Sequence, residues 1–101
     1  MKKVINGKMY NTATAKLIET FSHKYRNDFE YFKEDLYQKK TGEFFIDGEG
    51  GGLSKYAEEG ATGGWNFGSK VSPISEIEAK AWVEEHSDIE LYEELFGEVS
   101  E

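Results

Sequence analysis

At 101 residues, the chain is long enough for one modest hydrophobic core, so we treat residues 1–101 as a single domain. It has no cysteine, which excludes disulfides and thiolate metal sites and is typical of a reducing cytoplasm. No apolar run reaches the roughly 18 residues that a membrane-spanning helix needs, and no hydrophobic leader follows the first lysines. We therefore expect a soluble, cytoplasmic protein without a membrane partner.

Charge is distributed unevenly along the chain. Residues 1–40 hold nine of the twelve Lys and Arg but only five of the twenty Asp and Glu, which gives a net charge of +4. Residues 41–101 carry a net charge of −12, and the total is −8. Because net charge governs steering and association rather than fold, this asymmetry predicts a basic partner for the C-terminal part.

A hairpin and a helix are predicted before residue 23. The Asn-Gly pair at residues 6–7 lies between two short apolar pairs, which predicts a hairpin over residues 3–10, because a type I′ turn needs positive φ at both central positions. A helix capped by Asn11 or Thr12 should follow, pack on the hairpin and end near Ser22. Its apolar residues recur at near-helical spacing: Ala13, Leu17, Ile18 and Phe21.

The segment between residues 28 and 47 fits two interpretations. Phe29, Phe32 and Leu36 fit one face of a helix. Residues 36–38 and 43–46 instead fit two strands that are joined at Gly42. We favour strands for the later part, because three consecutive large β-formers follow Glu43, whereas residues 29–33 fit either interpretation.

Residues 48–68 hold eight of the eleven glycines, which predicts the most flexible stretch of the chain. Within this stretch, residues 53–58 are long enough for about one helical turn. A last strand is expected over residues 70–74. It contains Pro73, which lacks the amide donor that a central strand needs, so this strand should lie at a sheet edge or stop at Pro73.

Two helices are predicted at the C-terminal end. Residues 75–78, Ser-Glu-Ile-Glu, are a capping box and predict a helix to about His86. Residues 87–90 repeat this signature and predict a second helix to Phe96 that stops at Gly97. The second helix should have one apolar stripe, formed by Ile89, Tyr92, Leu95 and Phe96.

The predicted elements define an α+β fold. A small antiparallel β-sheet, made of the N-terminal hairpin and the central strands, should carry the helices on it. The two C-terminal helices should be strongly acidic, because ten acidic residues and only one basic residue, Lys80, lie from residue 76 onward.

These acidic helices are the strongest candidate for a binding surface. Intramolecular ion pairs cannot neutralise so many carboxylates with one lysine. One interpretation is a solvated face that keeps the protein soluble, and the other is docking on a basic surface that otherwise binds nucleic-acid phosphates. The candidate partner-binding residues are Glu84, Glu85, Asp88, Glu90, Glu93 and Glu94.

Two ligand sites in the glycine-rich stretch have weaker support. Residues 45–55 have the order strand, glycine-rich loop and short helix that can bind phosphate, but Lys55 follows Ser54 instead of preceding it. Asp47 and Glu49 would also repel an anion, so we favour a structural loop. The same two carboxylates could bind a hard cation, but the further acidic ligands of an EF-hand loop are missing. We therefore expect no metal and no other cofactor.

Catalysis also has little support. His23 and His86 lie at predicted helix ends, where the helix dipole explains them without chemistry. No cysteine nucleophile and no recognisable serine motif is present, so we do not expect an enzyme.

The N-terminal half interleaves basic residues with four tyrosines and could bind single-stranded nucleic acid, although its excess charge is only +4. Its tyrosines are Tyr10, Tyr25, Tyr31 and Tyr37.

Seven short segments, which are distributed over nearly the whole chain, form a recognisable pattern: residues 4–12, 36–37, 42–45, 48–51, 53–56, 79–82 and 93–98. In these segments the chain resembles a group of small proteins carried by phages and mobile elements of Gram-positive bacteria. Some members of this group resemble anti-CRISPR proteins that inhibit the type II-A RNA-guided nuclease, and this chain is similar to them in size and acidity. The shared residues are scaffold residues, so no active-site residue is carried over.

This resemblance implies a non-enzymatic inhibitor that binds the type II-A CRISPR effector nuclease in the host bacterial cell. It would interfere with binding of guide RNA or target DNA. Such a nuclease holds nucleic acids in positively charged channels and reads the PAM with arginines, so a carboxylate-rich helix suits the same surfaces. The alternatives are a nucleic-acid-binding regulatory module of a mobile element, with guide RNA as its partner, or a small enzyme that acts on guide RNA.

Overall fold

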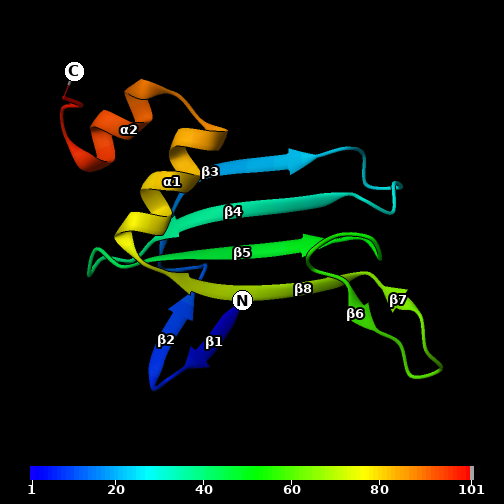
Figure 1. Cartoon of the computed structure of the whole chain (residues 1–101). Coiled ribbons are helices and arrows are strands. Elements are labelled where there is room, and N and C mark those ends of the chain that lie inside the picture. The colour runs from blue at the N-terminus through cyan, green and yellow to red at the C-terminus, as the bar shows by residue number, and fades with distance from the viewer. Residues whose placement is uncertain (101) are drawn as a thin grey trace.

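The computed structural model describes residues 1–100 and measures 50 × 32 × 20 Å. A four-stranded antiparallel sheet of order β3-β4-β5-β8 forms its centre, and two C-terminal helices lie on one face (Figure 1). The predicted α+β class is confirmed, and the N-terminal hairpin forms a two-stranded sheet of its own. The elements are β1 (Lys2–Ile5), β2 (Lys8–Asn11), β3 (Lys16–His23), β4 (Phe32–Gln38), β5 (Phe44–Gly50), β6 (Glu58–Glu59), β7 (Trp65–Asn66), β8 (Gly68–Ile74), α1 (Glu76–His86) and α2 (Ile89–Phe96).

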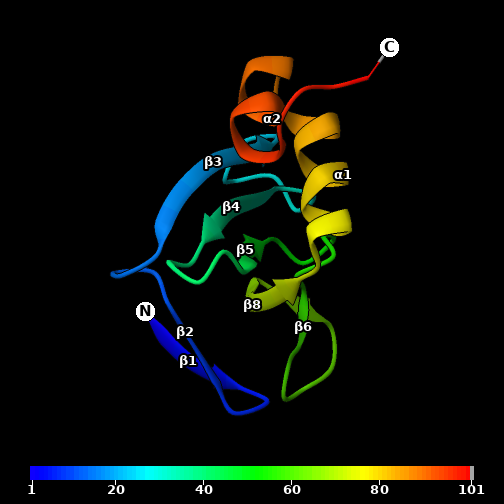
Figure 2. The same ribbon diagram turned by 90° about the vertical axis from the view of Figure 1, so that its left-hand side faces the viewer.

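The N-terminal hairpin forms as predicted. Asn6 and Gly7 have φ angles of 51° and 78°, which a type I′ turn requires. Tyr10 of β2 is buried and packs with Phe45 and Val71 of the central sheet. The hairpin therefore contacts the face of the sheet opposite to the helices, as the side view shows (Figure 2).

The helix predicted after the hairpin is wrong, because this segment forms strand β3 and pairs with β4. A β-bulge shifts the register between Leu17 and Glu19. Ile18 and Phe21 both pack against the core under the helices. A regular strand would place residues three apart on opposite faces, but the extra residue of a bulge brings them to the same face. The bulged strand therefore reproduces a spacing that is typical of a helix.

Two residues with predicted helical roles consequently have other roles. Asn11 does not cap a helix, and its Oδ1 accepts a hydrogen bond from Ala13 N at 2.9 Å in a turn. His23 lies at the end of β3, where its ring centroid is 5.3 Å from that of Phe32. The helix-dipole explanation therefore does not apply to His23.

The strand interpretation of the central segment is confirmed. β4 and β5 pair in continuous register from Phe32 opposite Gly50 to Gln38 opposite Phe44. The connection contains Gly42 with a φ of +94°, a backbone conformation that favours glycine. Residues 29–33, which fit either interpretation, do not form one element: residues 29–30 form a turn and Phe32 begins β4.

The glycine-rich stretch folds back onto the sheet. Residues 51–57 form two successive turns instead of the predicted helical turn, because Ser54 N donates to Gly51 O and Ala57 N donates to Ser54 O, at 3.0 and 3.2 Å. A Cβ atom at Gly48 would lie 2.1 Å from the ring of Tyr56. Glycine at this position therefore allows Tyr56 to lie directly against β5.

The predicted edge position of the last strand is confirmed. Among residues 1–100, β8 pairs with β5 on one side and has no strand on the other. Pro73 lies inside β8 opposite Phe45, and the strand continues to Ile74. Because β8 is an edge strand, the missing amide of Pro73 can face away from the sheet.

The helices and the sheet enclose the main core. α2 adds partly buried side chains at Leu91, Tyr92, Leu95 and Phe96, whereas Ile89, predicted on the same apolar stripe, is 61% exposed. Within residues 1–100, neither helix has the length and apolar character needed to cross a membrane. The buried residues of this core are Leu36, Phe44, Ile46, Ala79, Trp82 and Val83.

One buried carboxylate joins three parts of the fold. Glu34 of β4 is 2% exposed and is the only charged side chain buried among residues 1–100. It accepts hydrogen bonds from Trp82 Nε1 of α1 at 3.1 Å and from the Tyr56 hydroxyl, and it pairs with Lys55 Nζ at 2.9 Å. Burial by itself raises the pKa of Glu34, but the hydrogen bonds from these three side chains outweigh burial and lower the pKa.

Candidate functional site

Local hydrogen bonds fix where the first helix begins. Ser75 Oγ accepts from Glu78 N at 3.1 Å, and Glu78 Oε1 accepts from Ser75 N at 3.0 Å, so the predicted capping box is present. The hydrogen bonds with Ser75 lower the pKa of Glu78. The helix ends at His86, as predicted.

The second helix begins at a different cap from the one predicted. Asp88 Oδ1 accepts from Leu91 N at 3.0 Å, so Asp88 is the N-cap. Ser87 Oγ instead donates to Glu19 Oε2 of β3 at 3.2 Å, and this bond ties the turn between the helices to the sheet. Gly97 ends the helix as predicted, with a φ of +92°.

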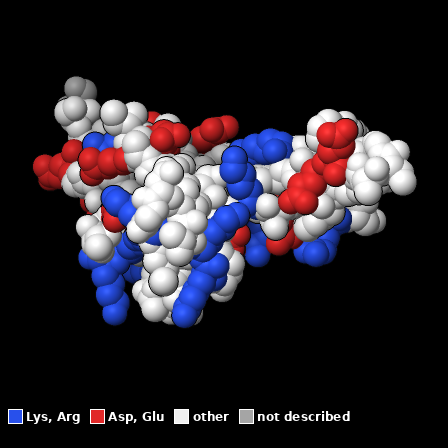
Figure 3. All heavy atoms as spheres, turned by 90° about the horizontal axis from the view of Figure 1, so that it is seen from below, with Lys and Arg blue, Asp and Glu red and all other residues white. Residues whose placement is uncertain are grey.

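The helix pair exposes all six acidic residues that the sequence singled out. Acidic side chains gather at the upper left of Figure 3, whereas Lys and Arg side chains lie below them and across the middle of that view. Within residues 1–100, the one contact of this set with a basic side chain joins Glu85 to His86 Nε2 at 3.9 Å, which is an ion pair only when His86 is protonated, and Glu85 remains 75% exposed. We call this set the acidic helix surface: Glu84, Glu85, Asp88, Glu90, Glu93 and Glu94.

The one nearby lysine does not neutralise this surface. Lys80 Nζ lies over the ring of Phe96, 5.6 Å from its centroid, and forms no ion pair within the described residues 1–100. Glu93 and Glu94 lie in the last turn of α2, where the helix dipole disfavours negative charge. Their charges therefore do not serve the stability of the helix.

A shallow apolar groove lies within the acidic helix surface. It is formed by the end of α1, the start of α2 and the C-terminal tail. Ile89 and Val99 are 61% and 49% exposed, so both present apolar atoms to solvent. The acidic rim of the groove is formed by Glu84 and Asp88. The complete lining is Val83, Glu84, Ser87, Asp88, Ile89, Tyr92 and Val99.

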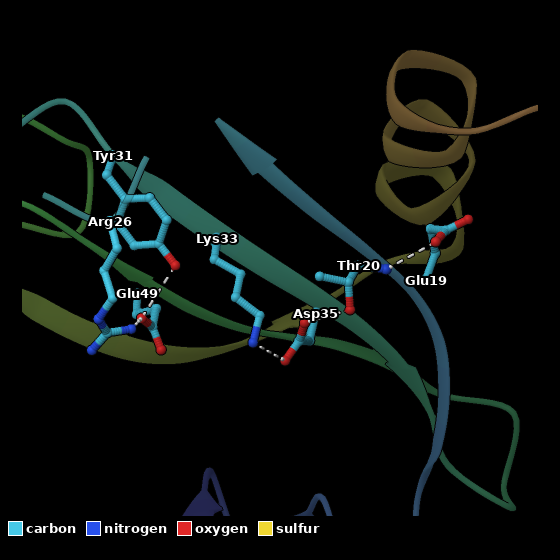
Figure 4. A network of polar contacts seen from close by, with 7 residues as sticks. All are labelled: Glu19, Thr20, Arg26, Tyr31, Lys33, Asp35 and Glu49. Atoms are coloured by element: carbon cyan, nitrogen blue, oxygen red, sulfur yellow. Dashed lines mark hydrogen bonds and ion pairs between the residues drawn. The ribbon is translucent and has the colours of Figure 1, made fainter. Parts of the chain in front are cut away.

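The face of the sheet opposite to the helices carries a network of polar contacts (Figure 4). Arg26 Nη1 pairs with Glu49 Oε2 at 2.9 Å, and Lys33 Nζ pairs with Asp35 Oδ2 at 3.7 Å. Thr20 Oγ1 donates to Asp35 Oδ1 at 2.7 Å. These carboxylates have partners within the fold, in contrast to those of the acidic helix surface.

The two ligand sites considered in the glycine-rich stretch are not assembled. Gly48 and Gly50 belong to β5, whose backbone pairs with β4 and β8, so they do not form a phosphate-binding loop. Glu49, one of the two carboxylates of the cation site, is paired with Arg26. Residues 1–100 contain no group of three or more His, Asp or Glu side chains placed to hold a metal ion.

The N-terminal tyrosines do not form a stacking surface for bases. Tyr10 and Tyr31 are 4% and 6% exposed. Tyr37 stacks on Phe45 with a centroid separation of 5.1 Å. Of the four tyrosines, only Tyr25 is freely exposed, at 84%. These rings therefore belong mainly to the packing of the sheet.

The sequence predicted acidic residues that the structure shows to be exposed, but it did not predict the apolar groove. Ile89 was placed on the buried stripe of α2 because its spacing from Tyr92 and Phe96 is helical. Asp88 turns out to be the cap, which leaves Ile89 as the first helical residue, at the open end of the helix. The signal that could have indicated this exposure is that Asp88, a good N-cap residue, directly precedes Ile89.

Comparison with protein-family models, curated proteins and solved structures found no match for this chain. The class that the fold and site define is therefore a small α+β protein with an acidic helix pair on one face of its sheet. Arguments about its function rest on the charge and shape of the acidic helix surface.

Proposed function

We propose that this protein is a non-enzymatic inhibitor that binds a basic nucleic-acid-binding protein through the acidic helix surface. The observation that carries the proposal is the exposure of six carboxylates that no Lys or Arg within residues 1–100 pairs with. Carboxylates on a helix pair can engage the Arg and Lys side chains that otherwise bind phosphates. Inhibition of this kind requires no chemical step.

The partner expected from the sequence resemblance is the type II-A CRISPR effector nuclease. Its guide and target channels are positively charged, so the acidic helix surface would compete with nucleic acid for the same side chains. The fold supports this role because both helices are held on the sheet by a core of apolar side chains and by the bond between Ser87 and Glu19. Asp88 also caps α2, whereas Glu93 and Glu94 are presented on a scaffold whose stability does not depend on their charges.

A triple charge reversal tests the proposal. Glu90, Glu93 and Glu94 changed together to Lys should abolish binding in a pull-down and restore DNA cleavage by the nuclease. The matched control reverses Glu30, Glu58 and Glu59, which are also exposed and lie outside the acidic helix surface. Both variants change the net charge from −8 to −2, so net charge alone cannot separate them. Full inhibition by the first variant would contradict the proposal.

The step that is blocked can be separated with the same cleavage assay. The protein is added either before guide RNA or after the guide complex has formed. Inhibition only before assembly would indicate competition with guide RNA, and inhibition after assembly would indicate competition with target DNA. A shift of labelled guide RNA by this protein alone would favour the nucleic-acid-binding alternative.

A further inference from the structure

We infer that the apolar groove takes one apolar side chain of a partner protein segment whose neighbouring residues are Lys or Arg. This inference rests on the proposed function and deepens it, because it describes the partner's contact segment. A surface that only imitates phosphates needs no apolar floor. Here Ile89 and Val99 expose apolar atoms, the partly buried Tyr92 also lines the groove, and the fully buried Val83 lies beneath it.

Charge complementarity decides which occupant fits. Glu84 and Asp88 line the groove itself, and both are exposed. Their negative potential would repel nucleic acid and would also repel the same surface of a second copy. A basic segment satisfies both carboxylates and delivers its apolar side chain to the floor. Interfaces commonly combine a desolvated apolar anchor with a polar rim in this way.

The two contributions should respond differently to salt. Attraction between exposed charges is screened as ionic strength rises, whereas burial of an apolar side chain is not. Binding through the groove should therefore keep a salt-resistant component. Binding by carboxylates alone would be lost steadily with added salt.

Fluorescence anisotropy with a labelled amphipathic Leu-Lys helical peptide tests the groove in the full chain. Ile89→Ser should weaken binding roughly tenfold, because an exposed apolar contact of this size is lost. The control Ile77→Ser removes an isoleucine that is 80% exposed on α1 but does not line the groove, and it should bind as the natural chain does. Equal binding by the two variants would overturn the inference.

Charge and apolar contact are separated by two further measurements. A peptide with Leu replaced by Ser keeps its charge and should bind roughly tenfold more weakly. Glu84→Gln together with Asp88→Asn should also weaken binding of the Leu-Lys peptide, and Asn keeps the capping ability of residue 88. Unchanged affinity in either measurement would overturn the inference.

The failure of this inference can be distinguished from failure of the proposed function. If Ile89→Ser still inhibits the nuclease fully while the triple charge reversal does not, the groove is not used and the proposed function stands. If the peptide binds as expected but the natural chain neither binds nor inhibits the nuclease, the groove is confirmed and the proposed nuclease target is wrong.

Discussion

Glu34 shows how much a single residue can determine in a small fold. Its carboxylate is surrounded by donors from α1 and from the glycine-rich stretch, so two segments distant in sequence are joined at one strand. Burial and the hydrogen bond to Glu34 raise the pKa of Tyr56 well above its usual value, so Tyr56 stays a neutral donor. This arrangement satisfies a buried charge that would otherwise be costly.

Replacing Glu34 should separate the effect of its charge from that of its hydrogen bonds. Glu34→Ala should destabilise the fold by about 3 kcal/mol, because it leaves the buried Trp82 Nε1 without an acceptor. Glu34→Gln should cost only about 1 kcal/mol, since its amide oxygen can still accept from Trp82 and the half-exposed Lys55 can turn to solvent.

Urea unfolding at neutral and acidic pH measures both variants. Because the pKa of Glu34 is lowered in the folded state, its ionised form stabilises the fold above the ordinary carboxyl pKa, and this contribution is lost as pH falls through the folded pKa. The deficit of Glu34→Gln should therefore shrink in acid. Equal losses for Ala and Gln at neutral pH would contradict the role assigned to the hydrogen bonds.

Gly48 gives a second prediction at the residue scale. Gly48→Ala should destabilise the fold by about 2 kcal/mol, because the new methyl group would overlap the ring of Tyr56 and displace it from Glu34. In a Tyr56→Ala background the same substitution should be almost neutral. A double-mutant cycle by thermal unfolding measures the difference, and additive effects would show that the two residues are not coupled.

At the scale of elements, strands and helices were not equally predictable. α1 and α2 have local signals, such as the capping box and Gly97, that act within a few residues of each helix end. β3 has no such signal, because its conformation depends on pairing with β4 and its bulge disturbs the alternation of strand residues. The turns of residues 51–57 also depend on distant contacts, since Tyr56 is held by Glu34.

The pairing of β4 with β5 leads to a pH-dependent prediction. Asp35 lies directly opposite Asp47, and burial, Asp35 and Glu49 raise the pKa of Asp47. The folded state therefore binds a proton more readily than the unfolded state, so the unfavourable contribution of Asp47 is complete above its folded pKa and disappears in acid. Asp47→Asn should stabilise the fold by about 0.5 kcal/mol at pH 7.

Urea unfolding at pH 7 and at acidic pH measures this effect. The advantage of Asp47→Asn should vanish as the natural aspartate becomes protonated. Glu59→Gln is the control, because it gives the same change in net charge at an exposed position. A similar stabilisation by the control would assign the effect to net charge instead of the cross-strand pair.

At the scale of the whole molecule, the fold of residues 1–100 separates the helix carboxylates that have no Lys or Arg partner from carboxylates that have partners. The acidic helices form one end, while Asp35 and Glu49 on the opposite face of the sheet are partnered by Arg26, Lys33 and Thr20. The resulting field should steer a basic partner toward the helices.

This steering predicts a salt effect on association with the effector nuclease. The association rate constant should fall roughly tenfold as ionic strength rises from about 0.05 to 0.5 M, because the Debye length shortens. Stopped-flow or surface plasmon resonance measures the rate. The triple variant of Glu90, Glu93 and Glu94 should lose most of this dependence, and a natural chain without salt dependence would contradict steering.

The sequence by itself determined the α+β class, the N-terminal hairpin, both C-terminal helices and the six carboxylates of the acidic helix surface. These features follow from positive-φ turns, helix caps and charge, which act over a few residues. Only the tertiary structure decided the conformation of β3, the burial of Glu34, the folding back of the glycine-rich stretch and the exposure of Ile89. Each of these depends on contacts between distant segments, where packing and hydrogen bonding outweigh local preference.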